Sequence, residues 1–297
     1  MNYEDIFQQA KQYGLEEVRL WEGGSVLFES SPDPEKRRPV HSIAKSILSM
    51  AAGIAIDEGK LGLEETVNTA LGAFHLADEN AAMLPEKCNL EHLLTMTLGQ
   101  EHAFLSRKDR DELRNYGEKN WILNCLKIPF VCDPGSQFLY SDACAYLFGK
   151  IFQRKVGMSI TEYLMPRLFE PLDIRRLVKW ECDPEGDVIC NSGLELSLEE
   201  IHRLSLLCLQ NGMFQGRQLI SQDWIQKAQS PIVKLKAGFG YGYYFWTGRN
   251  YSYMYGAGGQ YSFMIPSRNT VLTVLADVPD SKKLFIYLDE FIRKYTR

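Results

Sequence analysis

The segment from Ser42 to Glu58 constrains the fold more than any other part of this sequence. It predicts one long helix that ends at Gly59. Its apolar residues do not form a single stripe, because they recur on nearly every side of the helix; they are Ile47, Leu48, Ala51, Ala52, Ile54 and Ala55. A helix of this kind is stable only when other elements surround it. The rest of the chain is therefore expected to fold around a central buried helix.

Strands are predicted near both ends of the chain. After an amphipathic helix over residues 3–13, residues 18–21 and 25–28 flank a glycine-rich turn and predict a β-hairpin. Beyond residue 237, glycine, tyrosine and β-branched residues dominate and predict a strand meander followed by a closing helix. The expected meander strands are 241–246, 251–255, 261–265 and 270–276, and the expected helix is 282–294.

Residues from about 60 to 230 carry mainly helical spacing, with long loops between the helices. The predicted helices cover 91–97, 143–152, 161–169 and 198–210. This order predicts an α+β fold, in which the N-terminal hairpin joins the C-terminal strands in one antiparallel sheet flanked by helices. We expect a discontinuous α/β lobe of residues 1–58 and 232–297, a mainly helical lobe of residues 59–231, and a cleft between them, where ligand sites are common.

Composition and charge exclude several classes of function. The net charge is -5 and no run of lysine and arginine stands out, so neither nucleic acid nor a membrane surface is expected as a partner. No stretch of about 18 apolar residues predicts a membrane span. The seven cysteines are odd in number and irregularly spaced, which predicts free thiols rather than a zinc site or a disulfide framework. Free thiols and an N-terminus unlike a secretory signal favour a cytoplasmic protein.

Several familiar catalytic and ligand-binding motifs are missing from the sequence. There is no G-x-S-x-G nucleophile elbow and no H-E-x-x-H, and the five histidines do not cluster as metal ligands would. Residues 238–242 are glycine-rich but lead into a predicted strand rather than a helix, which argues against dinucleotide binding. Neither a metal ion nor an organic cofactor is therefore expected.

One motif that could carry catalysis remains, at the start of the long apolar helix. The S-x-x-K pattern of residues 42–45 places Ser42 and Lys45 on one face of the helix. The helix N-terminus favours negative charge, so it would stabilise an oxyanion that forms beside Ser42. The same positive pole and partial burial would lower the pKa of Lys45, and the neutral amine would then take the proton from Ser42.

A structural alternative explains the same residues without catalysis. Ser42 would be an N-cap that begins the helix, and Lys45 a solvated residue of the first turn. A pattern this short arises about once by chance in a chain of this composition. The apolar surroundings favour the catalytic interpretation, because lysine is rarely buried unless its amine is paired with another group.

Six segments, in the right order, resemble motifs of the β-lactamase-related serine hydrolases. This family includes class C β-lactamases, D-alanyl-D-alanine carboxypeptidases, family VIII esterases and 6-aminohexanoate-dimer hydrolase. Residues 41–46 resemble its S-x-x-K-S segment, and residues 55–67 resemble the segment that follows it. Residues 93–99 resemble its LLtMTSG segment, and residues 134–142 resemble its second catalytic motif, PG..f.YSN. Residues 169–172 resemble its fePLG segment, residues 193–197 resemble its gGl.sT segment, and residues 256–260 stand at the place of its third motif. The resemblance covers roughly residues 18 to 278 and implies a β-lactamase/transpeptidase-like fold.

The resemblance also implies roles for particular residues. Ser42 would be the acylated nucleophile, Lys45 its base or proton relay, and Tyr140 a second proton-transfer group whose phenol pKa is lowered by the Lys45 ammonium. The oxyanion hole would use the backbone N–H groups of Ser42 and Gln260, with Gly259 as the alternative to Gln260. The structural alternative for Tyr140 is a core tyrosine with a capped hydroxyl.

Two departures from the family's motifs bear on the substrate. Asp142 stands where asparagine is usual; an ionised carboxylate there would keep Lys45 charged and remove an amide donor, unless it only faces a helix end. The third motif has Gly256 or Ala257 in place of its lysine or histidine, the cation that helps to bind a substrate carboxylate in β-lactamases and carboxypeptidases. Esters or uncharged amides are therefore expected as substrates more than β-lactams or D-alanine peptides.

The resulting prediction is a serine hydrolase that cleaves ester or amide bonds of a small molecule through an acyl-enzyme on Ser42. The expected substrate-binding residues are Asp142, Ala257, Gly258 and Gly259. Two alternatives remain open at this point. One is a β-lactamase or D-alanyl-D-alanine carboxypeptidase, and the other is a non-catalytic ligand-binding or sensor protein on the same fold.

Overall fold

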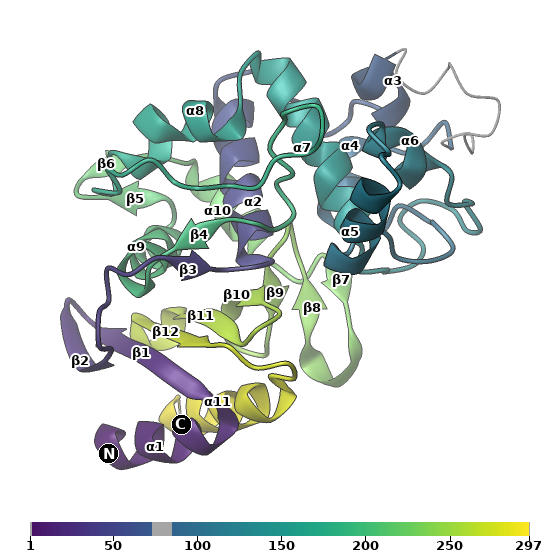
Figure 1. Cartoon of the computed structure of the whole chain (residues 1–297). Coiled ribbons are helices and arrows are strands. Elements are labelled where there is room, and N and C mark those ends of the chain that lie inside the picture. The colour runs from purple at the N-terminus through teal and green to yellow at the C-terminus, as the bar shows by residue number, and fades with distance from the viewer. Residues whose placement is uncertain (1, 73–84, 297) are drawn as a thin grey trace.

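A single antiparallel sheet joins the two ends of the chain in the computed structural model, which describes residues 2–72 and 85–296. In this part of the chain its strands lie in the order β2-β1-β12-β11-β10-β9-β8-β7 (Figure 1). Strand β1 pairs with β2 on one side and with β12 on the other, so the N-terminal hairpin joins the C-terminal strands in one sheet, as the sequence predicted. The strands are β1 Leu15–Glu22, β2 Ser25–Ser30, β7 Val233–Lys234, β8 Gly240–Tyr241, β9 Trp246–Thr247, β10 Ser252–Gly256, β11 Gln260–Ile265 and β12 Thr270–Ala276.

Two terminal helices cover one face of this sheet. Helix α1 (Tyr3–Ala10) and helix α11 (Lys282–Tyr295) lie side by side below the strands in Figure 1. Phe7 of α1 and Leu288 of α11 belong to one buried cluster with the apolar side chains of β1, β11 and β12. The two helices are also joined by a hydrogen bond of 2.8 Å, which the Tyr287 hydroxyl donates to the Ile6 carbonyl. The expected covering of the sheet by helices from both ends is confirmed.

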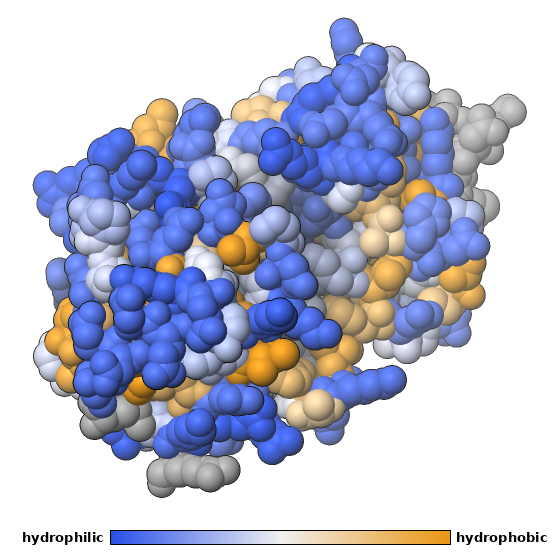
Figure 2. Space-filling view, turned by 60° about the horizontal axis from the view of Figure 1, so that its bottom comes forward, coloured by the Kyte–Doolittle hydropathy of each residue, from blue (hydrophilic) through white to orange (hydrophobic). Residues whose placement is uncertain are grey.

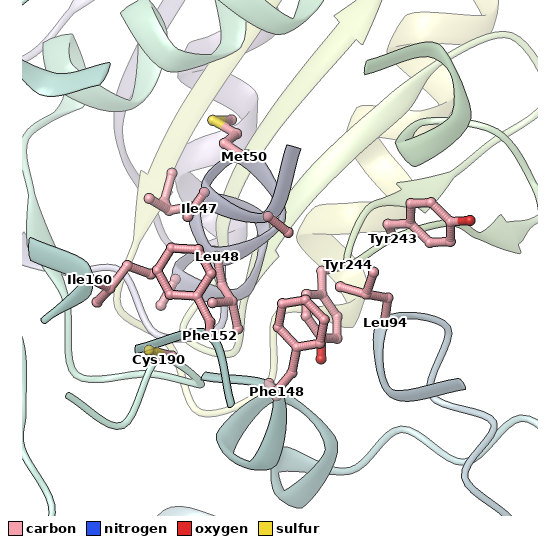
Figure 3. Packing of buried hydrophobic residues seen from close by; sticks show 14 of the residues in the cluster. Ile47, Leu48, Met50, Leu94, Phe148, Phe152, Ile160, Cys190, Tyr243 and Tyr244 are labelled. Atoms are coloured by element: carbon pink, nitrogen blue, oxygen red, sulfur yellow. The ribbon is translucent and has the colours of Figure 1, made fainter. Parts of the chain in front are cut away.

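The opposite face of the sheet packs against the long apolar helix, α2 (Ile43–Asp57), and against α9 (Leu198–Leu209). Every residue of α2 from Ile43 to Ala55 is buried, so the predicted central helix is confirmed. Helix α7 (Asp142–Val156) packs on its other side. Figure 3 shows Phe152 of α7 against Ile47 and Leu48 of α2.

The middle of the chain is mainly helical, and each of the four predicted helices overlaps an observed one. The remaining elements are β3 Arg38–Pro39, α3 Val67–Leu71, α4 Leu90–Leu94, α5 Arg107–Asn115, α6 Trp121–Leu126, α8 Ile160–Leu164 with the π-helical turn η3 Met165–Phe169, β4 Glu195–Leu196, β5 Met213–Phe214, β6 Arg217–Gln218 and α10 Gln222–Ala228. Residues 73–84 of the expected helical lobe lie outside the described residues. The division into lobes at residues 58 and 232 stays a prediction.

One strand expected from the sequence is absent as such. Residues 241–246 do not form a single strand, because β8 ends at Tyr241 and β9 begins at Trp246. Between them Tyr244 adopts a positive φ of 58°, and both Tyr243 and Tyr244 are buried. The Tyr244 N–H donates to the Leu94 carbonyl of α4 at 3.2 Å. Burial of two aromatic rings in the core has therefore outweighed the strand propensity of this segment.

Two further expectations concern the surface and the thiols. Among the described residues, no helix is both long and apolar enough to cross a membrane. Figure 2 shows one face of the molecule, on which hydrophilic residues cover most of the surface and hydrophobic residues form scattered patches. All seven cysteines lie in the described part of the chain and all are free thiols, as their spacing predicted.

Candidate active site

Ser42 stands at the start of α2, in the N-cap position. His41 before it has a φ of 49°, a left-handed conformation that is uncommon for a residue other than glycine and costs on the order of 1–3 kcal/mol. The Ser42 side chain makes no capping hydrogen bond to its own helix. Instead its Oγ accepts a hydrogen bond of 2.8 Å from the Nζ of Lys45. Ser42 therefore has the N-cap position that the structural alternative expected, but its side chain does not supply the capping hydrogen bond.

Lys45 is enclosed within the protein, with 1% of its side chain exposed. Its Nζ meets three acceptors: the Ser42 Oγ, the Asn191 carbonyl at 2.7 Å and the Asp142 Oδ1 at 2.6 Å. An ammonium group has three protons to donate, so this cage satisfies the charged form of Lys45. The alternative in which Lys45 is a solvated surface residue is wrong.

Tyr140 lies in the loop that leads into α7, close to Lys45. The Nζ of Lys45 is 5.2 Å from the centre of the Tyr140 ring. The ring stacks on Trp246 at a centroid distance of 5.5 Å and meets Tyr241 edge-on at 6.1 Å. These neighbours hold the ring in place, so that the hydroxyl, the amine of Lys45 and the hydroxyl of Ser42 converge at one point of the structure.

The charge states of this group differ from the expectation. Burial alone would lower the pKa of Lys45, but the Asp142 carboxylate and Tyr140 together raise it above its ordinary value. Burial raises the pKa of Tyr140, and this outweighs the opposing effect of the Lys45 ammonium and of hydrogen bonding with Ser42 and Lys45. The predicted lowering of both pKa values is therefore wrong. At neutral pH, Lys45 is a cation and Tyr140 a neutral phenol.

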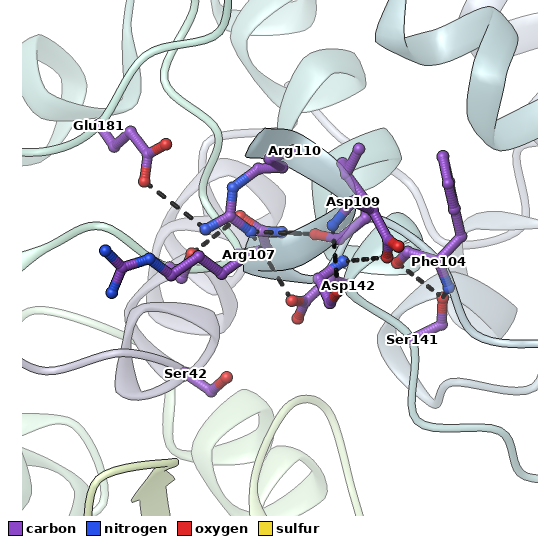
Figure 4. Close-up of polar contacts among 12 residues, drawn as sticks. Ser42, Phe104, Arg107, Asp109, Arg110, Ser141, Asp142 and Glu181 are labelled. Atoms are coloured by element: carbon purple, nitrogen blue, oxygen red, sulfur yellow. Dashed lines mark hydrogen bonds and ion pairs between the residues drawn. The ribbon is translucent and has the colours of Figure 1, made fainter. Parts of the chain in front are cut away.

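Among the groups that raise the pKa of Lys45, Asp142 has the largest effect. It is the first residue of α7, and its two carboxylate oxygens face two cations. Oδ1 contacts Lys45, as described above, and Oδ2 lies 3.8 Å from an Nη of Arg110. Figure 4 shows Arg110 reaching from α5 between Asp142 and Glu181. The sequence left open whether Asp142 pairs with Lys45 or only faces a helix end. The structure shows the pairing with Lys45.

The turn between β10 and β11 closes the site from the side of the sheet. A Cβ atom on Gly256 would lie 2.4 Å from the Val40 carbonyl oxygen, so only glycine allows the turn to pack against the backbone just before Ser42. Gly259 has a φ of 94°, and its N–H donates to the Gly256 carbonyl at 3.0 Å. The Gly258 N–H donates to the Oε1 of Gln260 at 3.1 Å.

These contacts bear on the four residues predicted in this turn. The side chain of Gln260 is buried and donates to the Ala276 carbonyl at 2.6 Å, so it braces the turn. Gly258 and Gly259 are buried, and their N–H groups are engaged within the turn. Ala257 is exposed and faces the cleft. The backbone N–H of Gly259 is thus already occupied within the turn, and Gln260 stays the predicted second oxyanion donor.

A cleft with a volume of about 930 Å³ opens beside these residues. Ser42, Tyr140, Asp142 and Ala257 all line it. Its lining also contains residues that the sequence analysis did not single out: Arg107, Arg110, Arg114 and Glu181. The three arginines share one face of α5, at helical spacing, but a short charged helix of this kind also suits a solvated surface, so no local signal distinguished them.

A second group of charged residues lies away from the cleft. Among the described residues, Asp183, Glu185 and Asp187 are close enough to one another to hold a metal ion. The Nζ of Lys150 already bonds to all three carboxylates, at 3.0 Å from Asp183, at 2.9 Å from Glu185 and in close contact with Asp187. A lysine ammonium therefore occupies the position that a cation would take.

The fold, the buried serine–lysine pair and the cleft beside it together place this chain in the class of serine hydrolases, as comparison with known proteins confirms. The family model described as Beta-lactamase matches residues 13–187, more than half of the chain, and the chain belongs to this family. The predicted family and the predicted β-lactamase/transpeptidase-like fold are thus confirmed.

Three relatives illustrate the similarity. The 6-aminohexanoate-dimer hydrolase of Paenarthrobacter ureafaciens is 22% identical over 305 residues, which cover 93% of this chain and 76% of the relative. A solved structure from Bacillus anthracis, provisionally named a 6-aminohexanoate-dimer hydrolase, superposes with a TM-score of 0.82 at 16% identity, covering 98% of this chain and 81% of the other. A penicillin binding protein from Bacillus halodurans gives a TM-score of 0.74 at 17% identity, with 97% and 99% covered.

Proposed function

We propose that this protein hydrolyses an ester or amide bond of a small molecule through an acyl-enzyme on Ser42. The observation that carries the proposal is the 2.8 Å hydrogen bond between the Ser42 Oγ and the Lys45 Nζ, at the edge of a cleft that Tyr140 also lines. A serine hydroxyl held against an amine and a phenol has adjacent groups that can accept its proton, which is what activation of a serine nucleophile needs.

In the proposed reaction, the Ser42 Oγ attacks the substrate carbonyl carbon. The proton of Ser42 passes to the Lys45/Tyr140 pair in its deprotonated form, and the same pair protonates the leaving alcohol or amine. The backbone N–H groups of Ser42 and Gln260 stabilise the oxyanion at the start of α2, where the helix dipole adds to their effect. Water then releases the acyl group from Ser42.

The side chains near the third motif favour an uncharged substrate. Gly256 or Ala257 stands at the place where related enzymes carry a lysine or histidine, and neither residue offers a charge to a substrate carboxylate; of the two, Ala257 lines the cleft. The proposed substrates are therefore esters and amides without a carboxylate at the third motif, and the cations of the cleft, Arg107, Arg110 and Arg114, lie on the side of α5. One relative is named for the hydrolysis of a 6-aminohexanoate dimer, which is consistent with an amide among the substrates.

A covalent probe tests the nucleophile directly. A fluorophosphonate should label the wild-type protein and leave Ser42→Ala unlabelled, and the same variant should lose hydrolysis of p-nitrophenyl acetate and butyrate. Ser192→Ala is the matched control, because Ser192 also lines the cleft and should leave labelling intact. Labelling that persists in Ser42→Ala would exclude Ser42 as the nucleophile. Nitrocefin added to the same assays reports whether β-lactams are cleaved.

A further inference from the structure

A second, smaller cavity of about 260 Å³ lies next to the catalytic cleft. Five of the residues that line it are aromatic: Trp246, Tyr253, Tyr255, Tyr261 and Phe285. The charged side chains in its lining, Asp280 and Lys282, are both exposed to solvent. A cavity with ring walls and polar groups at the solvent side is of the kind that takes up a flat apolar group.

Ala257 belongs to the lining of both cavities. It is exposed, and its side chain is a single methyl group, so no long side chain stands at position 257 between the cleft and the aromatic cavity. Gly256 or Ala257 stands at the place of the cation in the third motif of related enzymes, and neither residue carries a long side chain. The cleft and the aromatic cavity therefore meet at a residue that carries only a methyl group.

A row of stacked rings continues from the catalytic centre into this cavity. Tyr140 stacks on Trp246 with an interplanar angle of 27°, and Trp246 stacks on Tyr253 at a centroid distance of 6.4 Å and an angle of 22°. Tyr140 lines the cleft, whereas Trp246 and Tyr253 line the aromatic cavity. The two cavities thus share a continuous aromatic wall as well as Ala257.

The rings of the cavity are also held in fixed positions. Tyr255 and Tyr261 stack at a centroid distance of 4.9 Å, and the Tyr261 hydroxyl is hydrogen-bonded to the Oγ of Ser281 at 2.8 Å. The Tyr255 hydroxyl lies 3.4 Å from the same oxygen. A ring that is already ordered loses little freedom when a ligand stacks on it, so such a wall binds planar groups effectively.

We propose that the aromatic cavity behind Ala257 is a subsite of the catalytic cleft, which accepts an aromatic group of the ester or amide substrate. This inference rests on the proposed function and adds the chemical class of the substrate. Position 257 is the specificity-determining position, because its side chain decides whether the group can pass from the cleft into the cavity.

Matched esters test the subsite on both sides of the scissile bond. Comparison of p-nitrophenyl phenylacetate with p-nitrophenyl acetate varies the acyl group, and comparison of 2-naphthyl acetate with p-nitrophenyl acetate varies the alcohol. For each pair, kcat/KM of the ester with the aromatic group is divided by kcat/KM of p-nitrophenyl acetate, in the wild-type protein, Ala257→Lys and Tyr255→Leu. Division of each variant's ratio by the wild-type ratio cancels the intrinsic reactivity of the esters. Ala237→Lys is the control, since it makes the same change at an exposed position outside both cavities.

We expect one of the two ratios to fall by about 10- to 100-fold in Ala257→Lys and in Tyr255→Leu, and to stay at the wild-type value in Ala237→Lys. The pair that responds identifies the acyl or the alcohol side. Unchanged ratios in both variants, with Ser42 still labelled by the fluorophosphonate, would overturn the subsite alone. Loss of labelling in the wild-type protein would instead overturn the proposed function, and the subsite with it.

Discussion

The two walls of the catalytic cleft are built from opposite kinds of side chain. The wall from the helical part of the chain carries ionised groups, among them Arg110, Asp142 and Glu181. The wall from the sheet carries the methyl group of Ala257 and, beyond it, the rings of Trp246 and Tyr255. The helical wall sets the charge of Lys45, whereas the sheet wall is suited to select the shape of the substrate. Substitutions in one wall should therefore alter properties that substitutions in the other leave unchanged.

The largest effect is expected at Lys45, which lies between the two walls. Lys45→Met should lower kcat/KM for p-nitrophenyl butyrate by roughly 10³-fold, because the Lys45/Tyr140 pair that takes the proton of Ser42 would lose its amine. Thermal unfolding of the variant should be measured alongside, to establish that the fold is retained. If a folded Lys45→Met variant kept activity within tenfold of wild type, the proposed role of Lys45 in proton transfer would be wrong.

Arg110 tests how far the helical wall depends on its buried charge. Its side chain is 5% exposed, donates to the Leu105 carbonyl at 2.9 Å, and lies 3.6 Å from Glu181 and 3.8 Å from Asp142. Arg110→Met should lower the free energy of unfolding by about 2 kcal/mol, since both carboxylates lose one of their cations. Denaturant unfolding measures the change.

The control for this prediction is on the same helix. Arg107 has a side chain that is 85% exposed and lies 3.9 Å from Asp111, so Arg107→Met should change the free energy of unfolding by no more than about 0.5 kcal/mol. Equal destabilisation by the two substitutions would mean that burial of the charge is not what makes Arg110 important.

Asp142→Asn removes a negative charge from the helical wall and leaves the shape of the side chain almost unchanged. The Asp142 carboxylate helps to raise the pKa of Lys45, so its removal should lower that pKa and make the neutral amine more abundant at a given pH. The activity of the wild-type protein should therefore rise towards alkaline pH. In Asp142→Asn this rise should occur at lower pH. The ratio of activity at pH 7 to activity at pH 9.5 should then be several-fold higher in the variant than in the wild-type protein.

A second carboxylate in the cleft provides the comparison. Glu181 lines the same wall and pairs with Arg114 and Arg110 rather than with Lys45, so Glu181→Gln should leave the pH profile in place. A wild-type profile that is already level at pH 7, or the same shift in both variants, would contradict the role given to Asp142.

The smallest effect is expected at the solvent edge of the helical wall. Lys179 is paired with Glu195 at 2.7 Å, but its side chain is 77% exposed. Water screens such a pair, so Lys179→Ala should change the free energy of unfolding by less than about 0.5 kcal/mol. A destabilisation as large as that of Arg110→Met would show that exposed and buried charges in this wall contribute alike.

The sequence predicted the architecture because local patterns determine it. The apolar residues on every side of α2 require a buried helix, and the strands near both chain ends require partners, so one sheet of the N-terminal hairpin and the C-terminal strands could be inferred. The particular pairing of β1 with β12 is known only from the structure. The exception, residues 241–246, arose where core packing turned Tyr243 and Tyr244 inward against the local propensity. Ser42, Lys45 and Tyr140 were found through their motifs, and their roles in catalysis stay a prediction.

The charge states of the site could be predicted only in part from the sequence, which offered both a lowered pKa for Lys45 and an Asp142 carboxylate that would keep it charged. They depend on the distance between Lys45 and Asp142, which belong to helices far apart in the chain, and on the burial of both Lys45 and Tyr140. Burial and a helix N-terminus would have lowered the pKa of Lys45, but the Asp142 carboxylate at 2.6 Å and Tyr140 together raise it. The Asn191 carbonyl and Arg110 likewise reach the site from loops and faces that no local pattern marks.

The position of β1 in the sheet affects how the protein is made. Strand β1 lies between β2 and β12, and most of the described chain separates β1 from β12 in the sequence. The hairpin of β1 and β2 must therefore wait with one side of β1 unpaired until β12 has been synthesised. Nascent chains stalled before Thr270 should be more prone to aggregation and more dependent on chaperones than chains that extend past α11, because only β12 covers the second side of β1.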